Sequence, residues 1–532
     1  MVDTSDVSST SAGESALPGN HTSLWLATTP GTDYPQLRES TAADVAVCGG
    51  GIVGLTAAMQ LAERGLDVVV LERDRIIEGT TGHSTAKLTT QHGLKYDTLR
   101  SKHSPETAQQ YFAANQAAVE HVATRVKQWD IDCGFRRRPA ILYTEQPGRT
   151  TQIAAEREAA WEAGISATSD VEIPFSSTAR AGLTFPEQAQ FDPRSYLLAL
   201  AERFVSAGGR IFEESRVTDL ADGANCRVET DAGVVAADDV ILATQFPIRD
   251  RFGLFARLYP KRSYVLAAET AEPAPEGMYY RVDEPYFSVR SHETAEGTLT
   301  LIGGQNHKTG QGGETAERYR RLEQQAREHF EIDEIHYRWS TQDFASVDGL
   351  PYVGRGGPFT DSIYIATGFG GWGMSNGVAA GLLLSDLIAG QTNPWQSTLD
   401  PRRLTVKSSA PKLFAETANE AGQFVTGWAR AIRSTPAELQ PGDAAVYRDD
   451  REPVAAYRDA DGRLHTRSAV CPHMGCILEF NTAEQSWDCP CHGSRFDVDG
   501  HVLDGPALRN LRRVVSTESR DSTARPDDSS ST

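Results

Sequence analysis

Hydrophobic and polar positions divide the chain into three stretches with different periodicities. Between residues 42 and 390, short apolar runs typical of buried strands alternate with segments whose apolar residues recur at helical spacing. This alternation predicts an α/β fold. Residues 391–436 begin irregularly and then show one run with an apolar face, which predicts a connector with a single helix. Residues 437–515 consist of short strand-like runs separated by turn residues, the pattern of a small all-β module.

The two ends of the chain offer little for a core. Residues 1–22 and 516–532 are rich in Ser and Thr, and we expect most of residues 1–40 and the tail 516–532 to be disordered. The amino terminus has neither the basic start nor the apolar stretch of a secretory signal. No segment approaches the roughly 18 consecutive apolar residues of a membrane span. We therefore predict a cytoplasmic protein without a membrane span.

Acidic residues dominate the charge of the 532-residue chain. Its 72 Asp and Glu exceed its 52 Lys and Arg, which gives a formal net charge of −20. This excess repels nucleic acid and therefore argues against a nucleic-acid partner. Acidic, lysine-poor surfaces suit a salty cytoplasm because salt screens their self-repulsion, so a halophilic host is expected. A genomic base composition that favours Arg over Lys is the alternative explanation.

A glycine-rich turn follows the first buried run. Gly49, Gly51 and Gly54 form the pattern G-x-G-x-x-G between a strand pattern and a helix pattern. Such glycines let backbone amides approach a pyrophosphate at a helix N-terminus. Glu72 ends the next strand near the spacing at which a carboxylate binds ribose hydroxyls. Together these features predict a bound dinucleotide.

Residues 42–390 resemble the FAD-dependent oxidoreductases of the D-amino-acid oxidase and glycine oxidase superfamily. The resemblance lies in the glycine turn, the loop at 79–87, the segment at 191–196 and the closing stretches 348–354 and 366–390. It implies a Rossmann-like FAD domain joined to an antiparallel-sheet substrate domain. The residues that it implies for FAD binding are Gly49, Gly51, Gly54, Glu72, Arg73, Thr80, Thr81, His83, Val217, Gly368, Gly371, Gly373 and Met374.

The same resemblance leads to a specific hypothesis about His83, namely a covalent bond to the flavin. In the dimethylglycine and sarcosine dehydrogenases of this superfamily, a histidine in a similar loop is bonded covalently to the flavin. His83 follows Gly79, Thr80, Thr81 and Gly82 at the matching place. A simple hydrogen bond to the flavin or the loop is the alternative.

Four of the seven cysteines crowd together near the carboxyl end. Cys471 with His473 and Cys489 with His492 form two boxes, each offering one thiolate and one imidazole. Two Cys and two His can hold a [2Fe-2S] cluster or a zinc ion. The boxes and a later Gly-Pro-Ala loop resemble a Rieske domain over residues 437–513. This resemblance implies that the two cysteines bind one iron and the two histidines the other.

The same resemblance implies two further properties of the cluster. Cys476 and Cys491 match the cysteines that form the cross-loop disulfide of cytochrome bc-type Rieske domains. High-potential Rieske clusters follow the second box with Ser-x-Tyr, whereas here Ser494 is followed by Phe496. Fewer donors to the cluster sulfurs lower the potential, so we predict an intermediate value within about minus 150 to plus 300 mV.

The substrate is indicated less directly than the cofactors. Glycine-oxidase-like enzymes use an arginine to grip the substrate carboxylate, and Asp343 stands where that arginine would be. Asp343 could pair with the ammonium group of an amine. Alternatively it caps a turn, and Arg290 or Lys261 meets the carboxylate of an amino acid.

The expected function combines both halves of the chain. We predict a dehydrogenase that oxidises a C–N bond of an amine or amino acid. Its electrons would pass one at a time from FAD to the [2Fe-2S] cluster and on to an external acceptor, a ferredoxin-like protein or a quinone-linked carrier. The alternative is a non-catalytic flavin and iron-sulfur relay or redox sensor.

Overall fold

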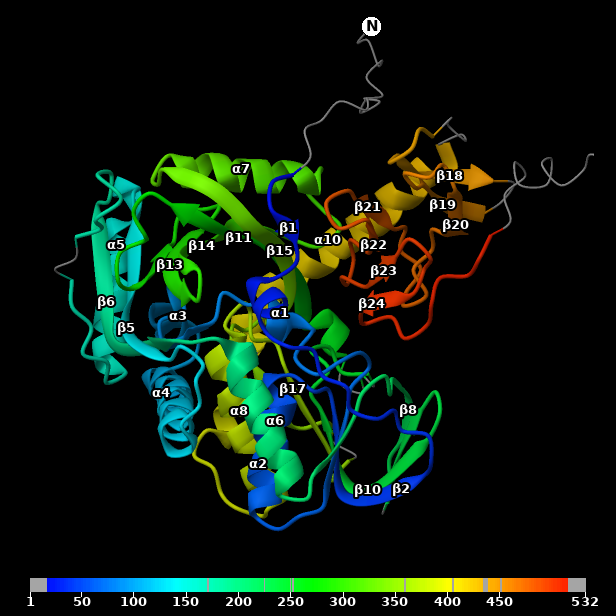
Figure 1. The fold of residues 1–532 in the computed structure, drawn as a ribbon, viewed down its shortest axis with the longest axis horizontal. Coiled ribbons are helices and arrows are strands. Elements are labelled where there is room, and N and C mark those ends of the chain that lie inside the picture. The colour runs from blue at the N-terminus through cyan, green and yellow to red at the C-terminus, as the bar shows by residue number, and fades with distance from the viewer. Residues whose placement is uncertain are drawn as a thin grey trace, which may run out of the picture.

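The fold has three regions: an α/β layer, a large sheet above it and a small all-β module at one side (Figure 1). The computed structural model describes residues 17–169, 172–223, 225–248, 250, 253–357, 360–403, 406–433, 439–449 and 452–514. The expected α/β fold with a small all-β region is confirmed. The tail 516–532 and residues 1–16, both expected to be disordered, lie outside the described residues.

The α/β layer is built on a sheet whose central strands are all parallel. In sheet order its main strands are β16 (Tyr352–Arg355), β17 (Ile363–Thr367), β10 (Val234–Leu242), β2 (Thr41–Cys48), β3 (Val68–Leu71) and β7 (Arg210–Phe212). Only β16 in this row is antiparallel, at the edge. An antiparallel pair, β8 (Val217–Ala221) and β9 (Cys226–Thr230), extends from β10.

Three helices cover one face of this sheet: α2 (Ile52–Glu63), α6 (Pro193–Ser206) and α8 (Gly373–Ile388). The helices α2 and α8 approach closely because α8 presents glycines to α2. A Cβ atom on Gly377 or Gly381 would lie 2.7 Å from the side chain of Ile52 or Thr56. This packing fixes the N-termini of α2 and α8 side by side, near the carboxyl ends of the parallel strands.

The large sheet has nine strands and is antiparallel except where β1 pairs β15 and β12 pairs β5. Its order is β1 (Asn20–His21), β15 (Ile332–Ser346), β11 (Leu258–Thr270), β14 (Gly297–His307), β13 (Phe287–Thr294), β12 (Met278–Arg281), β5 (Arg136–Thr144), β6 (Ala181–Gln190) and β4 (Lys87–Leu88). The helix α7 (Thr315–Arg327) packs its apolar side on β11 and β14.

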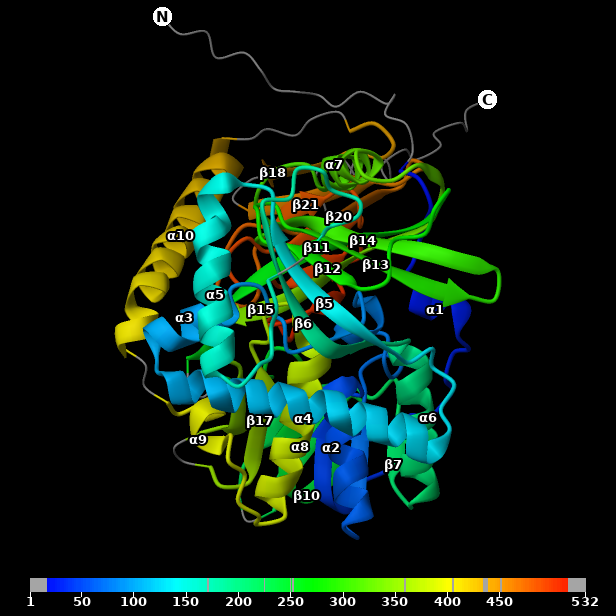
Figure 2. The same ribbon diagram turned by 90° about the vertical axis from the view of Figure 1, so that its left-hand side faces the viewer.

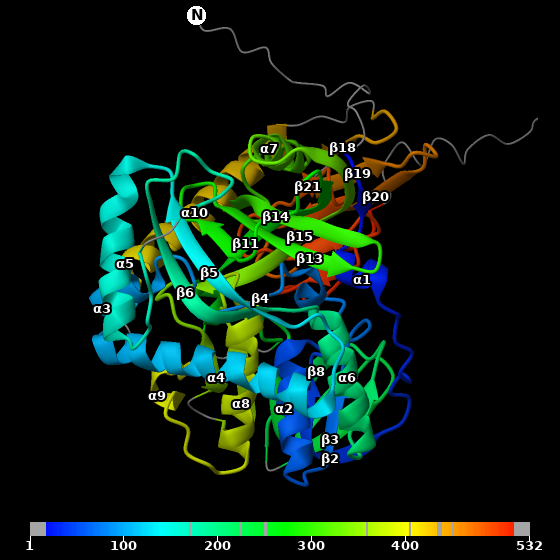
Figure 3. The same cartoon turned by 60° about the vertical axis from the view of Figure 1, so that its left-hand side comes forward.

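Further helices surround the junction of the two sheets. The helix α4 (Pro105–Trp129) lies across α2 and α8 below the large sheet (Figure 3). The helices α3 (Lys95–Lys102) and α5 (Thr150–Glu162) pack beside it. Short helical turns complete the layer: η1 (Thr80–His83), η2 (Pro147–Arg149), η3 (Leu254–Ala256) and α9 (Gln396–Leu399).

The small module consists of two sheets with a core of their own. One sheet contains β18 (Ala444–Asp449), β19 (Glu452–Arg458) and β20 (Leu464–Ser468). The other contains β21 (Glu479–Asn481), β22 (Ser486–Asp488), β23 (Arg495–Asp497) and β24 (Val502–Asp504). The 28-residue helix α10 (Val406–Arg433) leads to this module along the outside of the molecule (Figure 2). None of the helices in the described ranges is long and apolar enough to cross a membrane.

Residues 17–40 differ from the expected disorder. The strand β1 pairs with β15, and α1 (Leu24–Thr28) buries Leu24 and Trp25 completely. The indole Nε1 of Trp25 donates to the carbonyl of Ser84 at 2.7 Å. A two-residue apolar anchor is too short to show as a periodic pattern, so the prediction of disorder is wrong for this part.

Candidate active site and metal centre

The glycine turn after β2 is so tightly packed that a Cβ at Gly49 or Gly54 would overlap backbone atoms, and one at Gly51 would crowd a side chain. Gly49 has a φ of 110°, and a Cβ there would lie 2.5 Å from the carbonyl oxygen of Ala243. A Cβ on Gly54 would lie 1.9 Å from the carbonyl oxygen of Gly49. A Cβ on Gly51 would lie 3.0 Å from Oγ1 of Thr81. The turn therefore presents bare backbone at the N-terminus of α2, which fits a pyrophosphate.

Glu72 lies beside this turn, directly after β3. Its carboxylate accepts hydrogen bonds from the backbone N–H of Gly50 at 2.7 Å and of Asp74 at 3.2 Å. Burial raises the pKa of Glu72 above its ordinary value. Arg73, the next residue, donates to Asp74 at 2.8 Å. A carboxylate held at the end of the second parallel strand is the arrangement that receives ribose hydroxyls.

The short helix η1 closes over the start of α2. Oγ1 of Thr81 accepts from the backbone N–H of Ile52 at 3.2 Å, and the hydroxyl of Thr80 donates to the carbonyl of Gln342 at 3.1 Å. The ring Nδ1 of His83 lies 2.9 Å from the carbonyl of Gly79. Burial lowers the pKa of His83, so its imidazole is neutral at neutral pH.

The remaining predicted FAD residues lie on the closing loop and on β8. Gly368 and Gly371 follow β17 with φ values of 81° and 94°, which favour glycine. Gly373 and Met374 begin α8, and Val217 begins β8. The structure thus brings the turn, Glu72, η1 and the closing loop to the carboxyl ends of β2, β3 and β17. Dinucleotides bind at this edge in sheets of this kind.

The two Cys-His boxes converge in the small module. Cys471 and Cys489 are buried next to each other, and the rings of His473 and His492 are 4.9 Å apart between centroids. Nδ1 of both histidines is buried without a hydrogen-bond partner among the described residues. Burial lowers the pKa of His473 to about 4, so its ring is in the neutral, metal-binding form. Two thiols and two unpartnered ring nitrogens fit a cluster with sulfur ligands on one iron and nitrogen ligands on the other.

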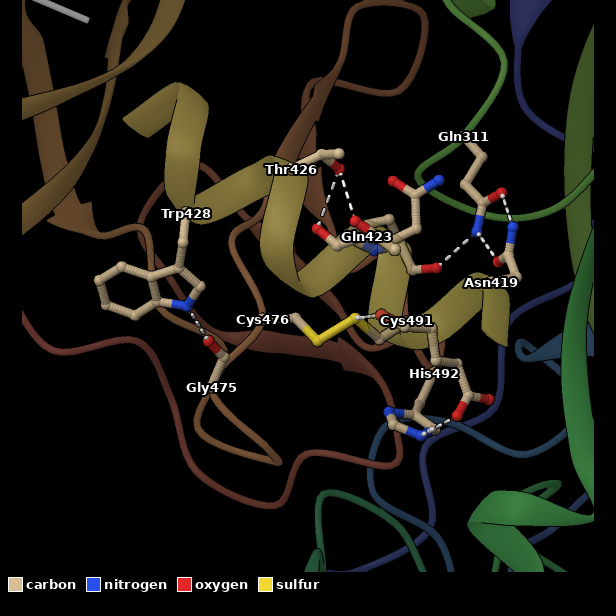
Figure 4. Close-up of a disulfide and its surroundings, with 12 residues drawn as sticks. Gln311, Asn419, Gln423, Thr426, Trp428, Gly475, Cys476, Cys491 and His492 are labelled. Carbon is tan, nitrogen blue, oxygen red and sulfur yellow. Dashed lines mark hydrogen bonds and ion pairs between the residues drawn. A yellow bond between two sulfur atoms is a disulfide. The ribbon is translucent and has the colours of Figure 1, made fainter. Parts of the chain in front are cut away.

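A disulfide joins Cys476 and Cys491 beside these ligands, with an S–S distance of 1.99 Å (Figure 4). The sulfur of Cys489 lies within 4.8 Å of both disulfide sulfurs. Because two of these three sulfurs are bonded to each other, the trio is not a set of metal ligands. The helix α10 packs on this side, where Trp428 Nε1 donates to the carbonyl of Gly475 at 3.0 Å.

The second box is docked directly on the flavin domain, the region of residues 42–390. A Cβ on Gly493 would lie 2.5 Å from Cβ of Pro260 in β11, and a Cβ on Gly310 would lie 2.7 Å from the nitrogen of Pro490. The rings of Phe255 and His492 are 5.8 Å apart. A side chain at Gly493 or at Gly310 would therefore overlap the proline that lies against it.

Other polar contacts between the module and the flavin domain surround the box. The amide Nε2 of Gln311 donates to the carbonyl of Pro490 at 2.7 Å, and Nε2 of Gln342 donates to the carbonyl of Gly493 at 2.8 Å. Glu484 forms an ion pair with Arg262 at 3.2 Å. The surroundings of Glu484 hold the pKa of its carboxyl well below the usual range, with Arg262 the first of the groups that lower it.

Asp343 does not present its carboxylate as a free ligand. It is buried and accepts from the backbone N–H of Phe344 at 2.7 Å and of Gly371 at 2.6 Å. Burial raises its pKa to about 6. Asp343 thus ties β15 to the closing loop, which fits the capping role left open by the sequence.

Arg290 is fully buried among backbone carbonyls. It is 0% exposed and donates to the carbonyls of Thr85, Ser291 and Phe191 at 2.7, 3.2 and 3.4 Å. We therefore no longer assign it to the substrate. Lys261 is half-buried and lies opposite Asp343 in the pairing of β11 with β15. Its role toward a substrate carboxylate stays a prediction.

Aromatic residues that the sequence patterns did not single out gather near the closing loop. Trp372 stacks on His92 with 4.7 Å between ring centroids and lies 5.2 Å from Tyr280, which in turn stacks on Tyr286 at 5.2 Å. Burial raises the pKa of Tyr286 to about 12, so its hydroxyl is protonated. These residues come from four separate segments, so no spacing in the sequence connects them.

Comparisons with known proteins agree with this division of the chain. Residues 44–387 match the family model of FAD dependent oxidoreductases, and residues 430–515 match that of the Rieske [2Fe-2S] domain. The Bacillus subtilis protein named as the Rieske 2Fe-2S iron-sulfur protein YhfW is 36% identical over 492 residues, which cover 92% of this chain and 97% of that protein.

Two further matches cover the first part alone. The gamma-glutamylputrescine oxidoreductase of Escherichia coli is 26% identical over 390 residues, 70% of this chain and 89% of that protein. The crystal structure of glycine oxidase from Geobacillus kaustophilus superposes with a TM-score of 0.57 at 21% identity, covering 68% of this chain and 99% of that one. At this identity the structural likeness bears on the fold alone.

Proposed function

The chain belongs to the family of FAD-dependent oxidoreductases and carries a Rieske [2Fe-2S] domain, and from this premise we propose an amino-acid dehydrogenase whose electrons leave through the cluster. When bound, FAD accepts a hydride from the C–H next to the substrate nitrogen, and the cluster carries electrons one at a time. The substrate reacts as the neutral amine after its ammonium group has lost a proton to solvent. Hydride loss leaves an iminium, which water hydrolyses to a carbonyl product and ammonium.

The observation that carries this proposal is the direct packing of the second cluster box on the flavin domain. Gly493 and Pro490 lie against Pro260 and Gly310 so closely that a Cβ on either glycine would clash. A box that holds two of the four candidate ligands is therefore fixed to the domain that holds FAD. Joining both in one chain also makes electron exchange intramolecular and raises the effective concentration of the acceptor.

The residues around the closing loop support an amino acid as the substrate. Asp343 accepts from two backbone amides, which supports the turn-capping alternative over the ammonium-binding one. Lys261 lies on the same face of the sheet and offers a cation to a carboxylate. Trp372 and Tyr280 would enclose the substrate side chain and exclude water from the reacting atoms.

The exposed side of the first box supports an external one-electron acceptor. His473 is partly exposed, and its neighbour Met474 is 51% exposed. An acceptor protein that docked here would reach the edge of a cluster ligand without entering the module. A ferredoxin-like protein or a quinone-linked carrier fits this role.

A substrate panel tests the proposal. Purified holoprotein is mixed without oxygen with amino acids and with the amines that correspond to them without the carboxylate, and the flavin absorbance is followed. We expect bleaching by at least one amino acid and none by its amine. Bleaching by amines alone would refute the substrate class, and reduction only by NAD(P)H or a reductase would favour the non-catalytic relay.

A matched pair of variants tests Lys261. Lys261→Met should raise the amino-acid concentration needed for half-maximal bleaching at least several-fold, because the carboxylate loses its cation. Lys127→Met, at an exposed lysine on α4, serves as the control and should behave like the unmodified protein. Equal behaviour of the two variants would remove Lys261 from the substrate site.

A further inference from the structure

The side chain of Gln342 in β15 connects the flavin domain to the second cluster box. It is 3% exposed, and its Nε2 donates to the carbonyl of Gly493 at 2.8 Å. The hydroxyl of Thr309 donates to Oε1 of the same amide at 2.6 Å. A backbone carbonyl only accepts, so the N–H groups of the amide must face Gly493, which leaves Oε1 to accept from Thr309.

The backbone carbonyl of Gln342 points to the other cofactor region. It accepts hydrogen bonds from the hydroxyl of Thr80 and from Nε2 of Gln245, and these two groups also bond to each other at 2.8 Å. Thr80 belongs to η1, the turn predicted to contact FAD. Gln245 follows β10, and its backbone carbonyl accepts from Thr367 at the end of β17. Gln342 therefore bonds to η1, in the predicted flavin site, through its backbone carbonyl and to Gly493 of the second cluster box through its side chain.

A second glutamine holds the same box without this connection. Nε2 of Gln311 donates to the carbonyl of Pro490 at 2.7 Å, a bond of the same kind and length. Its other partner is Asn419 of α10, at 2.9 Å (Figure 4). The contacts of Gln311 thus lead outward to the connector helix and not to η1.

We propose that Gln342 is a positioning residue for electron transfer between the two cofactors. It holds the box that contains His492 at a fixed distance from η1. Its two hydrogen bonds, joined by its own covalent bonds, form a route from Thr80 to Gly493, the residue next to that histidine. This inference rests on the proposed function and adds to it the residue that couples the two sites.

The experiment compares two substitutions that each remove one amide. Gln342→Met keeps the length of a buried side chain and removes the bonds to Gly493 and Thr309. Gln311→Met removes the bond to Pro490 and is the matched control. Thr309→Val removes the donor to Oε1 of Gln342 and so holds the amide less firmly, and it serves as the second test variant if Gln342→Met does not fold.

The main measurement follows flavin bleaching and cluster reduction separately after anaerobic mixing with substrate. We expect Gln342→Met and Thr309→Val to bleach at the unmodified rate but to reduce the cluster several-fold more slowly. The cluster potential and EPR spectrum should be unchanged, because Gly493 is not a ligand. Hydrogen exchange of residues 489–495 should be faster in Gln342→Met, a readout that needs no turnover.

Two results would overturn the inference. Cluster reduction at the unmodified rate in Gln342→Met and Thr309→Val would show that the route is not used. Equal slowing in Gln311→Met would show that any contact on the box has the same effect. Both differ from a failure of the proposed function itself, in which the flavin of the unmodified protein bleaches and the cluster is never reduced by it.

Discussion

The two cofactor sites are built in opposite ways. The flavin cradle, made of the glycine turn at 49–54, η1 and the closing loop after β17, uses backbone. Its critical positions are glycines: a Cβ at Gly49 or Gly54 would overlap backbone atoms, and Gly368 and Gly371 have positive φ values. The cluster site uses four side chains between residues 471 and 492. Ligation requires particular residue types, whereas a cradle requires the absence of side chains. The two sites should therefore fail independently and for different reasons.

The largest expected effect is the loss of the cluster through one ligand. Cys489→Ser replaces a thiolate that we propose as an iron ligand and should abolish the iron content and the cluster absorbance while FAD remains bound. Iron analysis and the visible spectrum measure both. Cys226→Ser, at a buried cysteine far from the boxes in sequence, is the control and should keep its iron. Full iron content in Cys489→Ser would contradict the ligand assignment.

A single added methyl group should be enough to disrupt FAD binding at the glycine turn. In Gly54→Ala the new Cβ would meet the carbonyl oxygen of Gly49 at 1.9 Å, so the turn must move and FAD binding should be largely lost. The flavin-to-protein ratio after desalting measures this loss, and the iron content should be retained. Gly148→Ala, where an added Cβ meets nothing within 4 Å, should keep its flavin. Normal flavin content in Gly54→Ala would mean that the turn does not hold FAD.

The contact between the small module and the flavin domain should weaken when the buried ion pair of Glu484 with Arg262 is broken. Glu484→Gln leaves Arg262, which is 1% exposed, without its carboxylate, and such a loss costs about 3–5 kcal/mol. Because the folded pKa of Glu484 lies below its unfolded value, its contribution is complete above the ordinary Glu pKa and is lost as the pH falls below it. Denaturant unfolding at several pH values should therefore show a deficit that shrinks in acid. A deficit that is absent at neutral pH would show that the pair does not stabilise the docking.

The smallest expected effect concerns Asp343 at the closing loop. Burial raises its pKa from 3.8 to about 6, so the folded protein binds more protons than the unfolded chain between these values. The ionised carboxylate therefore costs stability as the pH rises through this window, by about 1–3 kcal/mol. Asp343→Asn should lose this slope, which unfolding measurements at pH 4 and pH 7 would reveal. Parallel pH profiles for the two proteins would contradict it.

The sequence allowed the cofactors to be predicted but not the substrate pocket. Both predicted cofactors, FAD and the [2Fe-2S] cluster, are those of the matched families. Their motifs are local, because a tight turn and two ligand boxes each need neighbouring residues of fixed type. Lys261 on β11 and Arg290 on β13 are both cations of the large sheet, and only the packing shows that Arg290 is enclosed by carbonyls.

The same reason explains the other differences. Trp25 anchors residues expected to be disordered, through a partner far along the chain. Trp372 meets Tyr280 only after the α/β layer and the large sheet have packed together. The predicted intermediate potential depends on donors to sulfur, for which Ser494 and Phe496 are the residues to vary. That value and the halophilic host stay predictions.

The central claim is that electrons from the substrate reach the cluster through the flavin domain. It is tested by EPR of the holoprotein after an amino-acid substrate has bleached the flavin without oxygen or any other reductant. We expect the signal of a reduced [2Fe-2S] cluster in the same sample. A bleached flavin with a cluster that stays silent until dithionite is added would contradict it.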